Sequence, residues 1–432
     1  MDCLCGAKGE CLILKKRITA LLFAALAMLA LLALLSACDD NPADTIPPPT
    51  VTVSEAPEPV PPDVITPDVT ASPSAIPVSP SVTAPPSGTF APPTPSGVDD
   101  PLHDIMYYSK AVEFKDEAFE RAIRDTLGKP EGDIRVHEMT EITALFASDC
   151  GISDISGIEY CARLQTLYLT GNRISDISRL SGLSWLVTLE LYNNKIDDIS
   201  PLAGLAGLVS LNLAKNKISD ISPLSGLLSL KQLQISDNRI EDISPLSELS
   251  SLNLLALSNN RISDLRPLAE LTLLKILQAS DNKISDLSPL SGLTLLYYLE
   301  LNDNQISDLS PLAGVLSLSS LLMDNNKISD LRPLADLPVL YGVWMSGNEI
   351  SDIGPLSGLR EMRELYFDNN QIGDISAVAG MRLLFRLHMS GNNIADVSPL
   401  TGLPELYDVD LRDNPVADWS PLDMIEEVRG RP

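Results

Sequence analysis

The stretch LQTLYLTGNRISDISRLSGL, residues 164–183, decides the fold. Leu167 and Leu169 flank Tyr168, and this alternation predicts a short strand that buries the two leucines and exposes the residue between them. Asn172 follows, where a side-chain amide can both donate to and accept from backbone groups that would otherwise be buried without a partner. The segment ISPL, found at 199–202, 221–224 and 243–246 and with variations in other copies, predicts a tight turn because Ser can cap it and Pro suits its first position.

The same pattern returns every 22 residues without a slip. Units of this size bury their apolar faces only by stacking on one another, so the sequence predicts a curved solenoid. We expect a parallel sheet on its concave face and short 3-10-like turns on its convex face. The repeated asparagine then forms a ladder along the stack: Asn172, Asn194, Asn216, Asn238, Asn260, Asn282, Asn304, Asn326, Asn348, Asn370, Asn392 and Asn414.

A second ladder consists of aspartates. Stacked like charges repel, so we expect each carboxylate to accept backbone N–H bonds at its turn. A stripe of divalent cations is the functional alternative, but uniform placement along the whole chain favours an architectural role, and we predict neither a metal nor a cofactor. The ladder comprises Asp154, Asp176, Asp198, Asp220, Asp242, Asp264, Asp286, Asp308, Asp330, Asp352, Asp374, Asp396 and Asp418.

The consensus LxxLxLxxNxIxDIxPLxxL resembles the leucine-rich repeat, and more narrowly its internalin-type bacterial form. The resemblance covers about residues 111–432 and implies a right-handed solenoid of the α/β superhelix class. The segment FKDEAFERAIRDTLGK places apolar residues at helical spacing and ends near Gly128. Together with the approach ITALFASDCGISDISGIEY, it resembles the internalin-type N-terminal cap. We therefore expect a helical cap at 102–144, the solenoid at 145–414 and a closing cap at 415–432.

The chain begins with an export signal pattern. A basic start at Lys15, Lys16 and Arg17 precedes the apolar run 18–35 and the sequence LSAC. An apolar run of this length can also nearly span a bilayer as an anchor. The LSAC ending resembles a bacterial lipobox, which implies that residues 1–37 are a lipoprotein signal peptide and that Cys38 is lipidated. The expected localisation is the cell envelope, exported and anchored to the outer face of a membrane by lipid.

Residues 38–101 have a different composition. Eighteen of the chain's 33 prolines lie between residues 39 and 101, among Ser, Thr, Val and Ala. Such a segment cannot bury enough apolar surface to fold, so we predict a disordered stalk.

Charge and motif content exclude two function classes. The net charge of −27 argues against nucleic-acid binding. His103, His137 and His388 lie in no recognisable nucleophile, metal or phosphate motif, so we predict no catalytic residues and no enzyme.

Cys150 takes the asparagine place of the first coil and Cys161 a leucine place; we expect core thiols, with a disulfide as an open alternative. In the closing cap we expect Trp419 and Met424 to cover the last coil, with Arg429 facing water.

The variable positions of the strands point to a binding surface. In the late coils, the place between the two inward leucines holds Trp344, Tyr366 and His388, and the place after the first leucine holds Tyr341, Arg363, Phe385 and Tyr407. Rungs are ~4.8 Å apart, so we predict one continuous concave patch from these seven residues. Aromatic side chains with Arg are typical of binding hot spots.

The expected partner is an extracellular or envelope protein, with a glycan as the alternative. Internalin-like relatives imply adhesion. The competing hypothesis is a structural envelope spacer or assembly element whose rings merely cover one another.

Overall fold

The structure is a computed structural model that describes residues 107–431. The predicted signal peptide, Cys38 and the predicted stalk lie outside the described residues. The described residues belong to one compact unit. The described core residues lie between Val112 and Val428, so the unit has a core of its own. Within residues 107–431, no helix is both long and apolar enough to cross a membrane.

The unit begins with the predicted helical cap. Helix α3 (Glu117–Leu127) starts at Asp116, whose carboxylate accepts from the backbone N–H groups of Ala118 and Phe119, and ends at Gly128 in the left-handed region. The same carboxylate also accepts from the backbone N–H and hydroxyl of Ser153, which ties the helix to the first coil. The one-turn helix α4 (Val136–Met139) completes the cap.

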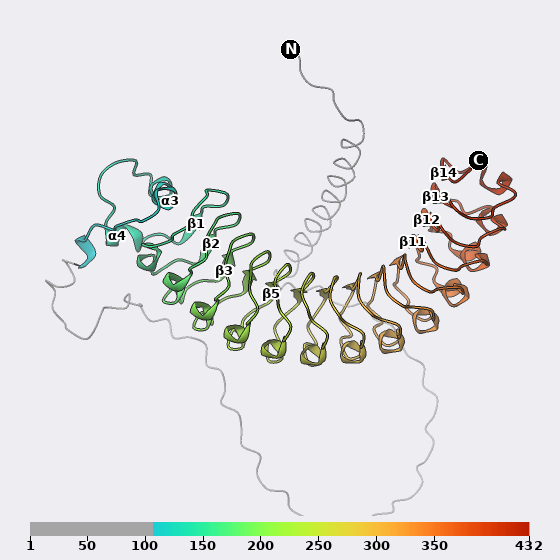
Figure 1. Ribbon diagram of the computed structural model, residues 1–432, viewed down its shortest axis with the longest axis horizontal. Coiled ribbons are helices and arrows are strands. Elements are labelled where there is room, and N and C mark those ends of the chain that lie inside the picture. Colours follow the sequence, from blue (N-terminus) through green and yellow to red (C-terminus); the bar gives the residue numbers. More distant parts are fainter. Residues whose placement is uncertain (1–106, 432) are drawn as a thin grey trace, which may run out of the picture. The chain divides into compact units, whose positions relative to one another are not determined.

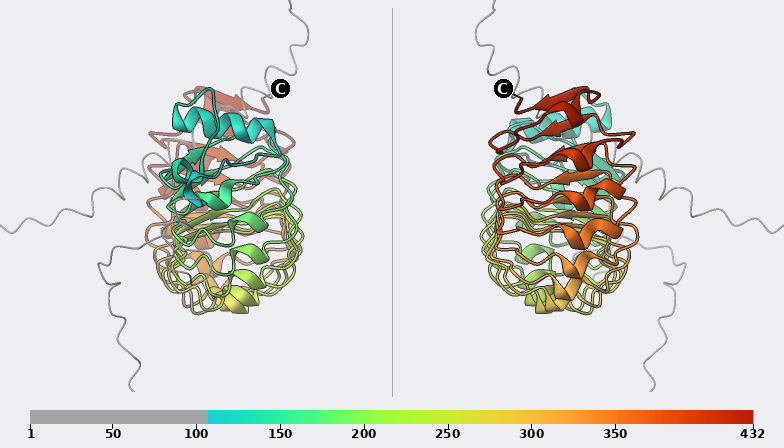
Figure 2. Two further views of the ribbon diagram at one scale, coloured as in Figure 1. Left: turned by 90° about the vertical axis from the view of Figure 1, so that its left-hand side faces the viewer. Right: turned by 90° about the vertical axis from the view of Figure 1, so that its right-hand side faces the viewer.

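The coils that follow confirm the predicted leucine-rich-repeat solenoid. Fourteen short strands pair in chain order into one sheet, and every pairing is parallel. Figure 1 shows the strands along the inner edge of the arc and the 3-10 turns along its outer edge. Seen from its ends, the stack has the helical cap at one end and only coils at the other (Figure 2).

The strands are β1 (Ala144–Phe146), β2 (Thr166–Tyr168), β3 (Thr188–Glu190), β4 (Ser210–Asn212), β5 (Gln232–Gln234), β6 (Leu254–Ala256), β7 (Ile276–Gln278), β8 (Tyr298–Glu300), β9 (Ser320–Leu322), β10 (Gly342–Trp344), β11 (Glu364–Tyr366), β12 (Arg386–His388), β13 (Asp408–Asp410) and β14 (Glu427–Arg429). The 3-10 helices are η2 (Ile158–Tyr160), η3 (Ser178–Leu180), η4 (Ser200–Leu202), η5 (Ser222–Leu224), η6 (Ser244–Leu246), η7 (Arg266–Leu268), η8 (Ser288–Leu290), η9 (Ser310–Leu312), η10 (Arg332–Leu334), η11 (Gly354–Gly358), η12 (Ser376–Gly380), η13 (Ser398–Leu400) and η14 (Ser420–Leu422).

The asparagine ladder ties each coil to the one before it. The Asn172 amide donates to the carbonyl of Ala147, one coil back, at 2.8 Å and to that of Leu169 at 2.9 Å. Its oxygen accepts from the backbone N–H of Ile152 at 2.9 Å. The same three bonds recur in later coils through Asn414. Each amide therefore satisfies backbone groups that the stacked turns hide from water.

The aspartate ladder has a different, local partner. One carboxylate oxygen of Asp176 accepts from the backbone N–H of Ser178 at 2.8 Å, and this bond to the second residue onward recurs in all thirteen coils of the ladder. Donation by that N–H group lowers the pKa of Asp176. The expected backbone acceptor role of these carboxylates is confirmed.

Two expectations about the ends of the solenoid, for Cys150 and Met424, are wrong, and the one for Arg429 is right only in part. Cys150 is exposed because the first coil has no earlier coil to cover its turn, whereas Cys161 is buried; both thiols are free. Met424 is 96% exposed, so it covers nothing, while Trp419 packs against the core. The predicted closing cap also contains strand β14. Its residue Glu427 pairs with Asp408, so the last coil has 19 residues instead of 22. The Arg429 side chain of β14 forms an ion pair with Asp408.

Candidate functional site

Three rings of the predicted patch lie in one row across the concave face. Register pairs Trp344 on β10 with Tyr366 on β11, and Tyr366 with His388 on β12. The Trp344 and Tyr366 rings are stacked, with centroids 5.6 Å apart and planes at 14°. His388 meets Tyr366 edge-on, with centroids 4.6 Å apart. All three rings are half-buried, so they form a continuous surface rather than separate protrusions.

Trp344 lies down on the sheet because its own strand leaves room for it. Gly342 is two residues earlier and faces the same side. A β-carbon built on Gly342 would come within 2.5 Å of two indole carbons, so the ring occupies the space that a side chain would fill. The bare glycine thus sets the orientation of the tryptophan.

The second column of the patch follows one edge of the same strands. Tyr341 is 40% exposed and Tyr407 is 36% exposed, and Arg363 is also exposed. Phe385 and Tyr407 are stacked, with centroids 6.1 Å apart and nearly parallel planes. Successive members join through the backbone, as in the 2.7 Å bond from the Arg363 N–H to the Tyr341 carbonyl. All seven predicted residues therefore lie on neighbouring late coils.

A third column, which the sequence analysis missed, supplies charge to this surface. Glu364, Arg386 and Asp408 are register partners on β11, β12 and β13. The Arg386 guanidinium lies 5.2 Å from the Phe385 ring centroid and donates to the Tyr407 hydroxyl at 2.9 Å. It also pairs with Glu364 at 3.4 Å and with Asp408 at 3.7 Å. One arginine thus holds the aromatic edge against the acidic column.

Asp408 is the centre of the charge network. It is 6% exposed, accepts from the Arg429 guanidinium at 2.8 Å and lies 3.2 Å from the His388 ring nitrogen. Arg429 also reaches Asp410 at 3.4 Å. The last three strands are thereby cross-linked by side chains on the concave side of the sheet, which limits the rotamer freedom of these side chains.

Burial and pairing set the ionisation of the patch. Burial raises the pKa of Tyr366 to about 12, so its hydroxyl stays neutral at physiological pH. Burial also raises the pKa of Glu364, against the opposing charge of Arg386. For Asp410, burial acts to raise the pKa, but hydrogen bonds from Arg412 and the charges of Arg412 and Arg429 together lower it. The acidic side chains of this surface therefore differ in how readily they take up a proton.

The missed residues had a signal in the sequence. Alternate residues of a strand face the same side, so the position before the central buried residue faces the concave side just as the position after it does. The same rule finds a polar cluster in the middle coils. There Glu300 accepts from Gln278 at 2.8 Å and from the Tyr298 hydroxyl at 3.2 Å.

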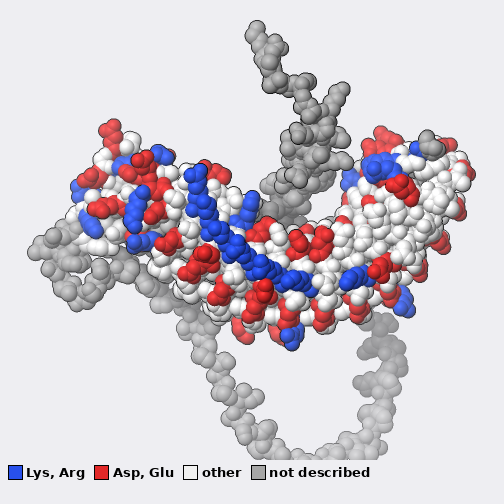
Figure 3. All heavy atoms as spheres, in the orientation of Figure 1, with Lys and Arg blue, Asp and Glu red and all other residues white. Residues whose placement is uncertain are grey.

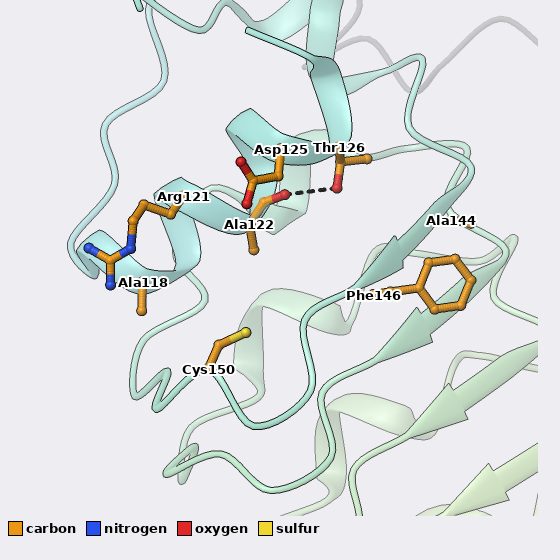
Figure 4. A pocket seen from close by; sticks show the side chains of 8 residues that line it. All are labelled: Ala118, Arg121, Ala122, Asp125, Thr126, Ala144, Phe146 and Cys150. Atoms are coloured by element: carbon orange, nitrogen blue, oxygen red, sulfur yellow. Dashed lines mark hydrogen bonds between the residues drawn. The ribbon is translucent and has the colours of Figure 1, made fainter. Parts of the chain in front are cut away.

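A second aromatic pair lies at the opposite end of the concave face. Phe146 is 67% exposed, and its ring centroid is 5.2 Å from that of Tyr168. Phe146 and Cys150 help line a depression of about 680 Å³ between α3 and β1 (Figure 4). The Thr126 hydroxyl in its wall donates to the carbonyl of Ala122. In residues 107–431, no group of three or more His, Cys, Asp or Glu side chains is arranged to hold a metal ion.

The comparisons with known proteins assign the family. Residues 162–204, 184–226, 206–248, 228–270 and 272–314 match the family described as "Leucine Rich repeats (2 copies)". The crystal structure of an internalin from Listeria monocytogenes is 37% identical, covers 73% of this chain and 95% of its own, and superposes with a TM-score of 0.71. This chain belongs to the internalin-like leucine-rich-repeat proteins. Internalin-like proteins of this kind are non-enzymatic binding proteins.

More distant structures share the fold of this internalin-like chain. A leucine-rich-repeat protein of Leptospira interrogans is 22% identical over 60% of this chain and 75% of its own, with a TM-score of 0.53. A plant peptide hormone receptor, solved as a complex, is 23% identical over 65% of this chain and 49% of its own, with a TM-score of 0.57. A search of curated proteins finds no match.

Proposed function

We propose that this internalin-like protein is displayed on a bacterial surface and binds a protein ligand through the concave patch of its late coils. The patch comprises Tyr341, Trp344, Arg363, Tyr366, Phe385, His388 and Tyr407, with Arg386 as an added member. The observation that carries the proposal is the continuous run of Trp344, Tyr366 and His388 across three adjacent strands. Trp, Tyr and Arg are the side chains on which binding energy concentrates in protein interfaces.

The geometry favours a protein ligand over a glycan. The patch is a broad surface with two ring columns and a charged column, instead of a narrow slot. Exposed Tyr341, Arg363 and Tyr407 give its rim both apolar area and hydrogen-bonding groups. The rings are held in place by stacking and by Arg386, so little side-chain freedom is lost on binding.

The proposal includes export and a lipid anchor at Cys38, on the strength of the LSAC pattern after an apolar run. Two or more acyl chains hold a protein stably on a membrane. Metabolic labelling with a fatty-acid analogue should mark the wild type and lose the label in Cys38→Ala. Equal labelling of both proteins would remove the anchor from this account.

The competing class is a structural spacer without a discrete ligand. It is favoured by one observation, that Trp344 packs on Gly342 and Tyr366 and so already covers much of its own apolar surface. If the protein binds a ligand through the patch, loss of the rings abolishes that binding while the fold stays intact. If the protein is a spacer, loss of the rings has no effect on binding.

The experiment compares three forms of residues 39–432 against a panel of purified extracellular proteins. They are the wild type, Trp344→Ala/Tyr366→Ala, and the control Phe146→Ala/Tyr168→Ala from the opposite end of the same face. We expect the control to keep wild-type affinity for the captured protein and the patch variant to lose about 30-fold or more, since one hot-spot ring contributes about 2 kcal/mol. Matching melting temperatures exclude unfolding as the cause. Equal affinity of all three forms would remove the patch as the site and favour the spacer.

A further inference from the structure

A row of cations runs along one flank of the solenoid, between the carboxyl ends of the strands and the 3-10 turns. Each member directly follows a ladder asparagine, and six consecutive coils carry one. Figure 3 shows the row crossing the middle of the molecule on the side turned to the viewer. Its members are all exposed: Arg173, Lys195, Lys217, Arg239, Arg261 and Lys283, with Lys327 two coils further on.

The backbone fixes the spacing of this cationic row. The N–H group of Lys195 donates to the carbonyl of Ile174 in the preceding coil at 2.8 Å, and that of Lys217 donates to Ile196 at the same distance. The bond recurs at Arg239, Arg261 and Lys283. Successive members are therefore one rung apart, ~4.8 Å, and the six consecutive cations cover about 24 Å in a line.

Few ion pairs engage the cations of the row. Of its members, only Arg261 has an ion pair in the described part of the chain, to Glu241 at 3.5 Å. A ladder aspartate lies three residues after each cation of the row. One of its carboxylate oxygens accepts from a backbone N–H of its own turn, as Asp220 accepts from Ser222. A line of available positive charge thus stands on a chain whose net charge is −27.

Acceptors for hydroxyl groups lie beside the cations. A depression of about 520 Å³ is lined by Ser219, Arg239, Glu241, Asp242 and Arg261. It brings two guanidinium groups together with two carboxylates and a hydroxyl. Guanidinium groups bind acidic oxygens, whereas carboxylates accept from hydroxyls.

We propose that the cationic row binds a linear anionic polysaccharide laid along the coils. Each rung step is close to the advance of a chain by one sugar ring, so sulfate, carboxylate or phosphate groups on successive sugars meet successive cations. Sugar hydroxyls between them donate to side chains such as Glu241 and Asp242. Double-stranded DNA carries one charge per ~1.7 Å of its axis, roughly three per rung, so its phosphates do not match the spacing of the row. The cationic row lies on earlier coils than the concave patch and on a different face of the solenoid.

The test uses heparin, a sulfated linear polysaccharide, as the probe, with residues 39–432 as the protein. The key variant is Lys217→Ser/Arg239→Ser/Arg261→Ser. The control Lys231→Ser/Lys275→Ser/Arg382→Ser removes the same charge from exposed cations outside the row. Affinity is measured against sodium chloride concentration, with heparin fragments of graded length and with a chemically desulfated chain.

We expect the wild type to bind heparin with an affinity that falls as salt rises and as fragments become shorter than six sugars. The row variant should lose at least tenfold in affinity, and its log–log salt slope should fall by about two to three, since each contact contributes ~0.7–0.9. The control and Trp344→Ala/Tyr366→Ala should bind like the wild type. Absence of wild-type binding at low salt, equal loss in both triple variants, or undiminished binding of the desulfated chain would overturn the proposal. Competition by duplex DNA as strong as by heparin would overturn the polysaccharide assignment.

Discussion

Single side chains of the asparagine ladder connect neighbouring coils. Asn326 donates to the carbonyls of Leu301 and Met323 and accepts from the N–H of Ile306. At 8% exposure, its bonds are shielded from water. The ladder could be predicted because the amide occupies a fixed place in every copy. The exposure of Cys150 could not be predicted, because the surroundings of the first coil depend on the cap and not on the repeat.

Asn326→Ala should lower the free energy of unfolding by about 2–4 kcal/mol, because buried carbonyl and N–H groups lose their partner. The control is Asn393→Ala. Asn393 is exposed and directly follows a ladder position, so this substitution should change the free energy of unfolding by less than about 0.5 kcal/mol. Denaturant unfolding measures both. Similar effects of the two substitutions would contradict the ladder's role.

Strands set which residues of the candidate site meet. The sequence predicts the Trp344 row because that position lies between two buried residues. It did not lead us to the column of Glu364, Arg386 and Asp408, although strand alternation turns that column to the same side. The orientation of the indole could not be predicted, because it depends on the space above Gly342 on the same strand.

Gly342→Ala tests that local arrangement. The added β-carbon would overlap the indole, so we expect Trp344 to lift off the sheet and leave its stack with Tyr366. Overpacking of this kind costs about 1–3 kcal/mol. The near-ultraviolet circular dichroism of Trp344 should change, and affinity for the captured protein should fall. Ser320→Ala, at the matching position of β9, is the control; an unchanged spectrum in Gly342→Ala would contradict the packing described.

At the scale of the molecule, repetition makes small effects add up. The fold could be predicted almost entirely because each coil contacts only its neighbours and repeats one pattern. The surroundings of Met424 and Arg429 at the C-terminal end could not be predicted, because these residues belong to a shortened coil that departs from the 22-residue pattern. The aspartate ladder is the clearest collective feature, because the same titrating group recurs along the whole stack.

Acid should destabilise the solenoid. The pKa is lowered at nine ladder positions, in most of them chiefly by hydrogen bonds from the residue two places onward; at Asp330 it falls to about 2. A lowered pKa gives stability that is full above the unfolded value of about 3.9 and is lost as pH falls through the folded value. Burial raises the pKa of Glu190, Asp324 and Glu364, and this has the opposite effect on stability, but among residues 107–431 it concerns only these three carboxyl groups. The melting temperature should therefore fall between about pH 4 and pH 2, and a constant or rising value would contradict this reading.

The central claim is that a protein ligand covers the concave patch of the late coils. Hydroxyl-radical footprinting of the free and the ligand-saturated protein locates that contact directly. We predict protection of Tyr341, Trp344 and Tyr407, with no change at Phe146 and Tyr168 on the same face. Protection confined to the early coils or to the convex turns, with Tyr341 and Tyr407 still reactive, would contradict it.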